Sequence, residues 1–333
     1  MWLSFKNMNY IEIEGYKSIK KARIDLRPLN ILIGANGSGK SNFISFFEFL
    51  KNLIEGNIQT YIEIKGGQDK FLFQGQKITD KIYFKVDIDE STNFGLALIQ
   101  SNDGFVYKHE NLLGNPFNAL NNLKTYQFND TSPNSPFTKM SHIENDIFYL
   151  YQDGGNLAGT LYHIRETNAK AYNLIVKIIQ SVAPYFLDFV LLPNEGKYLS
   201  LKWKDRFCDT VYGVNDLSDG TLRFIALTVL FMQPNPPEMI IIDEPELGLH
   251  PFAVAKLAGM MQSAAARNCQ VIAATQSVEL INHFEADDVI TVDNINGESV
   301  FERLSSEKLS VWLDDYSLGD LWKMNIIDAA QPN

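Results

Sequence analysis

Residues 34–41 read Gly-Ala-Asn-Gly-Ser-Gly-Lys-Ser and match the pattern GxxxxGK[ST] at every fixed position. The segment before them, 29–33, is a short apolar run, which predicts a buried strand that feeds a glycine-rich turn. After them, apolar side chains recur at helical spacing, at Phe43, Phe46, Phe47, Leu50 and Ile54. The stretch therefore predicts a strand, a phosphate-binding loop and a helix, the opening of an α/β fold.

The glycines of this loop let the backbone curl so that several N–H groups face one point, and the following helix adds its positive end. We expect the phosphates of ATP to lie against Asn36, Gly37, Ser38, Gly39, Lys40 and Ser41. Lys40 would act in catalysis by reaching the β- and γ-phosphates, and the Ser41 hydroxyl would bind Mg²⁺.

A second apolar run, 239–242, ends in two acidic residues, Asp243 and Glu244. Carboxylates at the C-terminal end of a buried strand project into the crevice where open α/β sheets bind ligands. Asp243 is expected to hold Mg²⁺, directly or through water, and Glu244 to accept a proton from the attacking water or to orient it. Taken alone, the run also fits two solvated acids that begin a loop before Pro245.

Strands and helices alternate in the last third of the chain. Helices are predicted over 222–232 and 252–266, and strands over 270–274 and 289–292. Such alternation predicts a largely parallel central sheet with helices on its faces.

The middle of the chain reads differently. Residues 60–100 have strand patterns, with 82–88 and 94–99 as a hairpin, whereas 101–145 have loop composition and 145–185 helical spacing. No heptad pattern persists, so we expect no long coiled coil. The predicted fold is an α/β P-loop head with an antiparallel β part and an inserted helical arm or lid. Its core would comprise 1–100 and 210–333, and the insert 101–209.

Composition narrows the class of protein. The net charge of −11, from 29 basic and 40 acidic residues, argues against a surface coated in positive charge for nucleic acid. The two cysteines, Cys208 and Cys269, form no CxxC motif, which favours a reducing compartment over a disulfide framework. The sequence contains neither an apolar run long enough to span a bilayer nor a signal-peptide pattern, so the expected location is cytoplasmic, with no membrane contact.

Between the phosphate loop and the carboxylates, residues 217–223 read Leu-Ser-Asp-Gly-Thr-Leu-Arg. This segment resembles the signature motif of ABC-type ATPases in the form found in RecF-, SMC- and OLD-like proteins. Residues 273–277, Ala-Ala-Thr-Gln-Ser, are similar to the switch motif of the same group. Further segments resemble RecF-type openings and the stand-alone bacterial ATPases termed AAA_21, namely Tyr10–Ile19, Tyr126–Ser132, Gly155–Ala158 and Tyr316–Trp322.

In this group the signature motif of one subunit closes over ATP held by the other. The resemblance therefore implies a homodimer or a higher homo-oligomer, in which Ser218 and Gly220 contact the γ-phosphate in trans. Gln276 stands where the group often has a catalytic histidine; its amide can donate a hydrogen bond to the γ-phosphate but cannot carry charge. The candidates for the Q-loop glutamine are Gln152 and Gln74.

The resemblance implies a hydrolysing ATPase that acts as a nucleotide-driven switch or sensor for DNA or a partner effector, in anti-phage defence or DNA repair. Two other interpretations stay open, namely the nucleotide-binding subunit of a membrane transporter and an ATP-binding scaffold without significant turnover. OLD-like proteins continue into a Toprim nuclease domain, for which this chain leaves no room. We therefore expect a nuclease or toxin activity in a separate effector protein. DNA would contact a local basic face formed by Lys17, Lys20, Lys21, Arg23 and Arg27.

Overall fold

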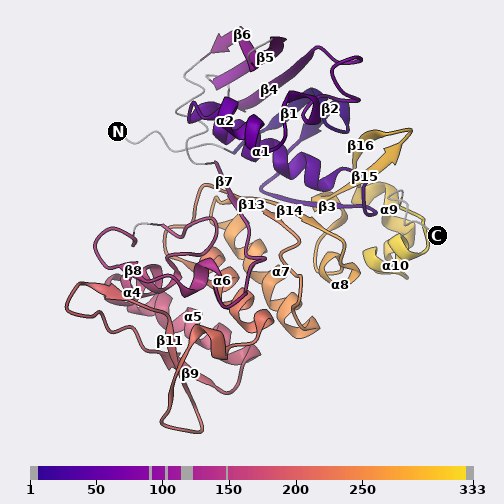
Figure 1. Cartoon of the computed structure of the whole chain (residues 1–333). Helices are drawn as coiled ribbons and strands as arrows, with labels where there is room; N and C mark the ends of the chain where they lie inside the picture. The colour runs from indigo at the N-terminus through magenta and orange to yellow at the C-terminus, as the bar shows by residue number, and fades with distance from the viewer. Residues whose placement is uncertain (1–6, 90–91, 102–103, 114–122, 148, 328–333) are drawn as a thin grey trace. The chain divides into compact units, whose positions relative to one another are not determined.

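The computed structural model describes residues 7–89, 92–101, 104–113, 123–147 and 149–327 (Figure 1). They group into two compact units. The first unit contains the described parts of Met1–Thr125, Pro237–Glu244 and Asn268–Asn333, and the second unit contains those of Tyr126–Pro236 and Pro245–Arg267. The units divide the chain differently from the predicted core and insert, and that predicted division stays a prediction.

A six-stranded sheet carries the site of the first unit. Its order is β16-β15-β3-β14-β13-β7. The bounds are Leu29–Ile33 for β3, Leu123–Tyr126 for β7, Met239–Asp243 for β13, Gln270–Thr275 for β14, Val289–Ile295 for β15 and Glu298–Arg303 for β16. Strands β15, β3, β14 and β13 run parallel, and β16 is antiparallel to β15. Every residue of β3 and β14 is buried, which explains their unbroken apolar runs and confirms the predicted parallel sheet.

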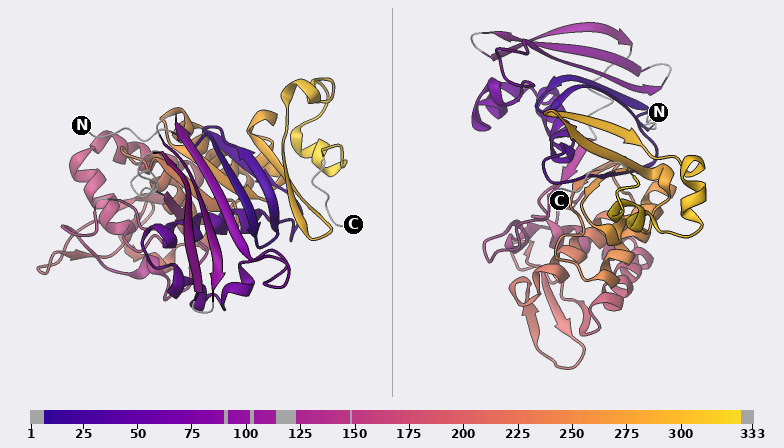
Figure 2. Two further views of the ribbon diagram at one scale, coloured as in Figure 1. Left: turned by 90° about the horizontal axis from the view of Figure 1, so that it is seen from above. Right: turned by 90° about the vertical axis from the view of Figure 1, so that its right-hand side faces the viewer.

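The second sheet of the first unit is antiparallel, with the order β2-β1-β4-β5-β6. Its strands are β1 Tyr10–Tyr16, β2 Ile19–Asp25, β4 Lys81–Asp89, β5 Thr92–Ser101 and β6 Gly104–Leu113. Figure 2 shows β4, β5 and β6 side by side in a twisted sheet. The predicted hairpin is confirmed, because Ile82 pairs with Leu98 and Val86 with Phe94 across β4 and β5.

Helix α1, Lys40–Ile54, belongs to one hydrophobic core together with residues of both sheets. Its aromatic side chains are fully buried, and the Phe46 ring meets that of Tyr16 edge-on, with the ring centroids 4.9 Å apart. Burying one such side chain stabilises the fold by about 1.5–3 kcal/mol. This packing fixes the first turn of α1, and with it Lys40 and Ser41.

Two expectations for the middle of the chain were wrong. Residues 58–64 form a helix, α2, because Ile58, Tyr61 and Ile62 are buried on one face at helical spacing. The region 101–145, expected to be loop, contains β6 and β7, because pairing with β5 and with β13 outweighs the turn-rich composition of the region. The remaining elements of the first unit are η1 Gln68–Lys70, α8 Val278–Ile281, η4 Ala286–Asp288, α9 Ser306–Leu313 and α10 Leu318–Lys323.

The second unit is built mainly of helices. They are α4 Leu157–Thr167, α5 Ala169–Val182, α6 Asp219–Met232 and α7 Pro251–Ala266, and α6 contacts the other three. Short elements complete the unit, namely η2 Pro136–Thr138, β8 Ser141–His142, β9 Phe186–Phe189, β10 Tyr198–Leu199, β11 Lys202–Asp205, β12 Val211–Gly213 and η3 Val214–Asp216. Within the described ranges of both units, no helix is both long enough and apolar enough to cross a membrane.

Candidate ATP-binding site

The predicted phosphate loop joins the end of β3 to the start of α1, as the motif requires. Lys40 is only 4% exposed, and its Nζ donates to the carbonyl oxygens of Gly34 at 2.6 Å and Ala35 at 2.9 Å. The ammonium group therefore lies across the mouth of the loop, bonded to the loop itself. A bound nucleotide would replace these two acceptors with phosphate oxygens.

A tight contact explains why residue 39 is glycine. Its φ of 114° lies in the region that favours glycine, and a Cβ there would be 1.9 Å from Ser299 Oγ and 2.9 Å from Ser18 Oγ. Ser299 lies on β16 and Ser18 lies in the turn between β1 and β2. The sequence offered no signal for these two serines, because isolated serines form no pattern and Ser299 is far from the loop along the chain.

Asp243 and Ser41 meet at the C-terminal end of β13, where sequence reasoning placed a Mg²⁺ site. Burial raises the pKa of Asp243, as does the nearby Glu244 carboxylate, while a hydrogen bond with Ser41 and the charge of Lys40 lower it. Its Oδ1 is buried and has no hydrogen-bond partner among the described residues. A buried carboxylate oxygen without a donor, beside a hydroxyl, fits a divalent cation with oxygen ligands.

Glu244 follows β13 in a strained backbone conformation, with a φ of 47°. Its N–H donates to the carbonyl oxygen of Ala274 at 2.8 Å, and its carboxylate accepts a hydrogen bond from Gln276 Nε2. Gln276 comes directly after β14, so two neighbouring parallel strands bring the two side chains together. The structure thus joins the predicted base and the predicted switch residue in one pair within the first unit.

The predicted signature residues lie at the start of α6 in the second unit. Ser218 is exposed and caps the helix, with its side chain accepting from the N–H of Thr221 at 3.2 Å. A Cβ on Gly220 would lie 2.5 Å from the carbonyl oxygen of Gly248, so this position has no room for a side chain. A capped helix N-terminus with an exposed hydroxyl is suited to an anion such as a phosphate.

The two candidates for the Q-loop lie in different places. Gln74 is in the first unit, with its Nε2 beside Gly297 in the turn between β15 and β16, and Gln152 is in the second unit, where its carbonyl accepts from the N–H of Gln127. The sheet order adds Gln127 itself, since it directly follows β7, the neighbour of β13. Sequence reasoning missed this residue because the neighbours of a strand come from the sheet order and not from the chain.

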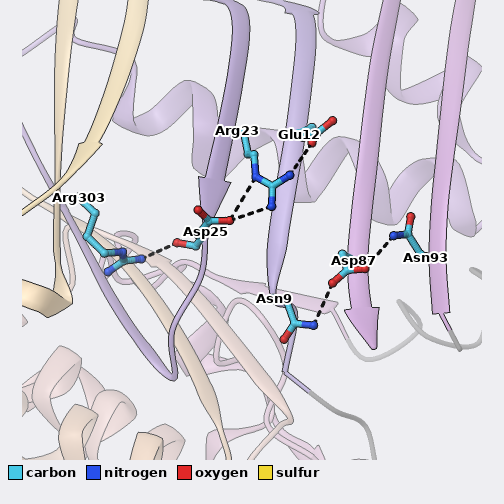
Figure 3. A network of polar contacts seen from close by, with 7 residues as sticks. All are labelled: Asn9, Glu12, Arg23, Asp25, Asp87, Asn93 and Arg303. Carbon is cyan, nitrogen blue, oxygen red and sulfur yellow. Dashed lines mark hydrogen bonds and ion pairs between the residues drawn. The ribbon is translucent and has the colours of Figure 1, made fainter. Parts of the chain in front are cut away.

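Four of the five residues of the basic stretch that sequence reasoning offered to DNA form ion pairs with acids. Lys20 pairs with Glu298, Lys21 with Glu14, Arg23 with Glu12 and Asp25, and Arg27 with Asp287. Figure 3 shows Arg23 between Glu12 and Asp25, with Arg303 bonded to the Asp25 carbonyl. Lys17 donates to Ser45 Oγ at 2.8 Å, and burial lowers its pKa.

Comparisons with known proteins identify the family and the fold of the chain. A family model described as "AAA ATPase domain" matches residues 7–178, and one described as "AAA domain, putative AbiEii toxin, Type IV TA system" matches residues 212–282. No curated protein matches the chain.

Solved structures of SMC heads have the same fold. An SmcHead bound to the C-winged helix domain of ScpA is 18% identical with a TM-score of 0.66, covering 90% of this chain and 99% of that chain. A Smc head from Pyrococcus furiosus, with an extended coiled coil and bound to the C-terminal domain of ScpA, is 16% identical with a TM-score of 0.62, covering 92% and 98%. The SMC head domain from Thermotoga maritima is 15% identical with a TM-score of 0.52, covering 90% and 99%.

These matches confirm the expected RecF- and SMC-like fold of the ABC type, and the first family model covers just over half of the 333 residues. The chain belongs to the AAA ATPase domain family and is an ATP-binding ATPase with the fold of an SMC head.

Proposed function

We propose that this ATPase is a nucleotide-driven switch in which two copies close around ATP. The observation that carries the proposal is the exposed, capped start of α6, where Ser218 offers a hydroxyl and Gly220 packs closely against the Gly248 carbonyl. In the proposed dimer these residues of one copy contact the γ-phosphate held by the other. ATP then favours the closed pair and hydrolysis releases it, because a ligand shifts an equilibrium toward the state that it binds better.

Each residue of the candidate site in the first unit has a proposed part in hydrolysis. The N–H groups of 36–41 and the Lys40 ammonium hold the phosphates, and Ser41 and Asp243 hold Mg²⁺, which neutralises charge on the phosphate oxygens. Glu244 takes a proton from the attacking water, which adds to the γ-phosphorus as the bond to ADP breaks. Gln276 holds the Glu244 carboxylate and donates to the γ-phosphate without changing its own charge.

The switch is proposed to act on a separate effector protein, a nuclease or toxin, in anti-phage defence or DNA repair. Two findings support a protein partner. The family model over 212–282 has a description that names a toxin system, and two similar SMC heads were solved bound to ScpA domains. The paired charges of the basic stretch make a protein partner a better fit than DNA at that face.

Light scattering of the Glu244→Gln variant tests the dimer, because this change should slow hydrolysis and trap the ATP-bound state. We expect its mass to double on adding ATP and Mg²⁺, and we expect Ser218→Arg in the same background to stay a monomer, since a bulky cation would block the α6 N-terminus. A constant dimer would mean that other surfaces hold the copies together. A monomer that binds ATP and never associates would refute the trans arrangement.

Removing two charges from the basic stretch tests the alternative in which this face binds DNA. We expect the double variant Lys20→Gln, Lys21→Gln to bind duplex DNA with the same affinity as the unaltered protein, because both lysines are already paired with acids. Fluorescence anisotropy over a series of salt concentrations measures this. A salt slope that falls by about 2 in the variant would show that both lysines contact phosphates.

A further inference from the structure

A line of polar side chains connects two distant segments of the first unit to the phosphate loop and the first turn of α1. Ser299 Oγ, on β16, lies 2.6 Å from the Ser38 carbonyl oxygen and 2.7 Å from Ser18 Oγ. Asn42, in the first turn of α1, donates from Nδ2 to Ser18 Oγ at 2.7 Å. The backbone repeats the connection, since the Ser299 N–H donates to the Ser18 carbonyl oxygen at 2.7 Å.

The Ser299 hydroxyl has two acceptors within hydrogen-bond distance. A carbonyl oxygen only accepts, an amide NH₂ only donates, and each hydroxyl has a single proton. The Ser299 hydroxyl donates toward the Ser38 carbonyl oxygen, the shorter of its two contacts, and toward Ser18 Oγ, which also accepts from Asn42 Nδ2. Ser299 is 1% exposed and its bond to the Ser38 carbonyl is buried, so water has little access to that bond.

The contact between Ser299 and the Ser38 carbonyl also orients the N–H of Gly39, because both groups belong to one planar peptide bond. In a trans peptide the carbonyl oxygen and the following N–H point in opposite directions. Because the Ser38 carbonyl is held toward Ser299, the N–H of Gly39 is turned away from β16. The missing Cβ of Gly39 lets Ser299 Oγ approach this closely, since a Cβ would be 1.9 Å away. On the same hairpin, Asn294 Nδ2 reaches the Gly37 carbonyl oxygen at 3.4 Å.

We propose that Ser299 is a positioning residue, which orients the Gly39 N–H toward the β-phosphate of the bound nucleotide. The role rests on the proposed assignment of 34–41 as the phosphate loop of the site. Loops of this type hold the α- and β-phosphates through backbone N–H groups. Since ATP and ADP share the β-phosphate, Ser299 contributes equally to the binding of both, whereas a group that acts at the γ-phosphate affects ATP alone.

Calorimetry with ADP and with ATP, together with steady-state kinetics, tests the role in Ser299→Ala. We expect the Kd of both nucleotides to rise about tenfold, since a buried carbonyl loses its donor. The KM for ATP should rise alongside, while kcat at saturating ATP stays within about twofold, because the β-phosphate contact is made before and during the reaction. A variant that is merely less stable would instead lose active protein, and so kcat, without a change in KM.

Thr291→Val is the matched control. Thr291 lies on β15 of the same hairpin, is 3% exposed and bonds through Oγ1 to the Glu302 carbonyl instead of the loop. We expect both its Kd values to match those of the unaltered protein, and we expect Ser299→Thr, which retains the hydroxyl, to restore most of the affinity that alanine loses. Equal weakening in Thr291→Val, or unchanged Kd values in Ser299→Ala, would overturn the proposal.

Two further outcomes distinguish failure of the proposal from misfolding of the variant and from a wrong assignment of the phosphate loop. If Ser299→Ala does not fold, Ser299→Cys decides, because it keeps a side chain at this position and replaces the hydroxyl that donates to the Ser38 carbonyl with a weak donor. A rise of about threefold in both Kd values is then expected, and no rise refutes the proposal. If the unaltered protein binds neither ADP nor ATP, the assignment of the phosphate loop itself is wrong.

Discussion

Replacing Glu244 with glutamine is expected to lower kcat for ATP hydrolysis about 100-fold or more, since a positioned general base contributes about 10²–10⁴-fold. Glutamine has nearly the same volume and its side-chain oxygen can still accept the hydrogen bond from Gln276. The loop contacts of Lys40 are untouched by the change. ATP should therefore bind about as tightly as before. Phosphate release at saturating ATP and Mg²⁺, with the Kd for ATP measured on the same sample, gives both numbers.

The control for this variant is at the other end of the same strand. Glu238 precedes β13, whereas Glu244 follows it, so Glu238→Gln makes the same chemical change away from the phosphates. Its turnover should equal that of the unaltered protein. If Glu244→Gln hydrolyses ATP normally, another group takes the proton. If the unaltered protein binds ATP and shows no turnover, the chain is an ATP-binding scaffold, the interpretation that the neutral side chain of Gln276 left open.

The backbone conformation at Glu244 also supports its assignment as the general base. A φ of 47° is costly for a residue with a Cβ, and the cost is of the order of 1–3 kcal/mol. The conformation lets the Glu244 N–H extend the ladder to Ala274 while its carboxylate turns to Gln276. Strain of this kind is tolerated where the neighbours fix the conformation, and here both partners belong to β14 or directly follow it. The strain therefore supports an assignment that rested on sequence pattern alone.

The sequence predicted the parts of the site whose functional residues are consecutive in the chain. The phosphate loop and the β13 carboxylates are short runs whose residue types and flanking strands reveal their geometry. The switch pair was also within reach, because Glu244 and Gln276 both follow buried strands, and neighbouring parallel strands end at the same edge of a sheet.

What the sequence could not predict depends on pairing between distant segments. Ser299 reaches the loop only because β16 folds back along β15. Lys20 is paired with an acid only because Glu298 lies in the same hairpin as Ser299. The pairs of the basic stretch with Glu298 and Asp287 join segments far apart in the chain, so the sequence alone did not reveal them. A different limit applies to α2, where the run of buried side chains at Ile58, Tyr61 and Ile62 was too short to distinguish from a strand.

Replacing Lys40 with methionine is expected to weaken ATP binding about 100-fold or more, because truncating one partner of a buried charge pair costs about 2–5 kcal/mol. Methionine keeps the apolar stem of the side chain, which is buried at the base of α1, and removes only the ammonium group. Without nucleotide the variant loses the two bonds to the Gly34 and Ala35 carbonyls, so its Tm should fall by a few degrees at most. With ATP, the difference between the two proteins should become large.

Thermal unfolding over a series of ATP concentrations measures this difference. A ligand that binds only the folded state raises Tm with concentration, so the unaltered protein should gain stability at ATP levels that leave Lys40→Met unchanged. Lys51→Met is the matched control, since Lys51 lies in the last turn of the same helix and pairs with Glu55. It should respond to ATP as the unaltered protein does. Equal stabilisation of Lys40→Met by ATP would show that Lys40 serves the loop, through its bonds to Gly34 and Ala35, and not the nucleotide.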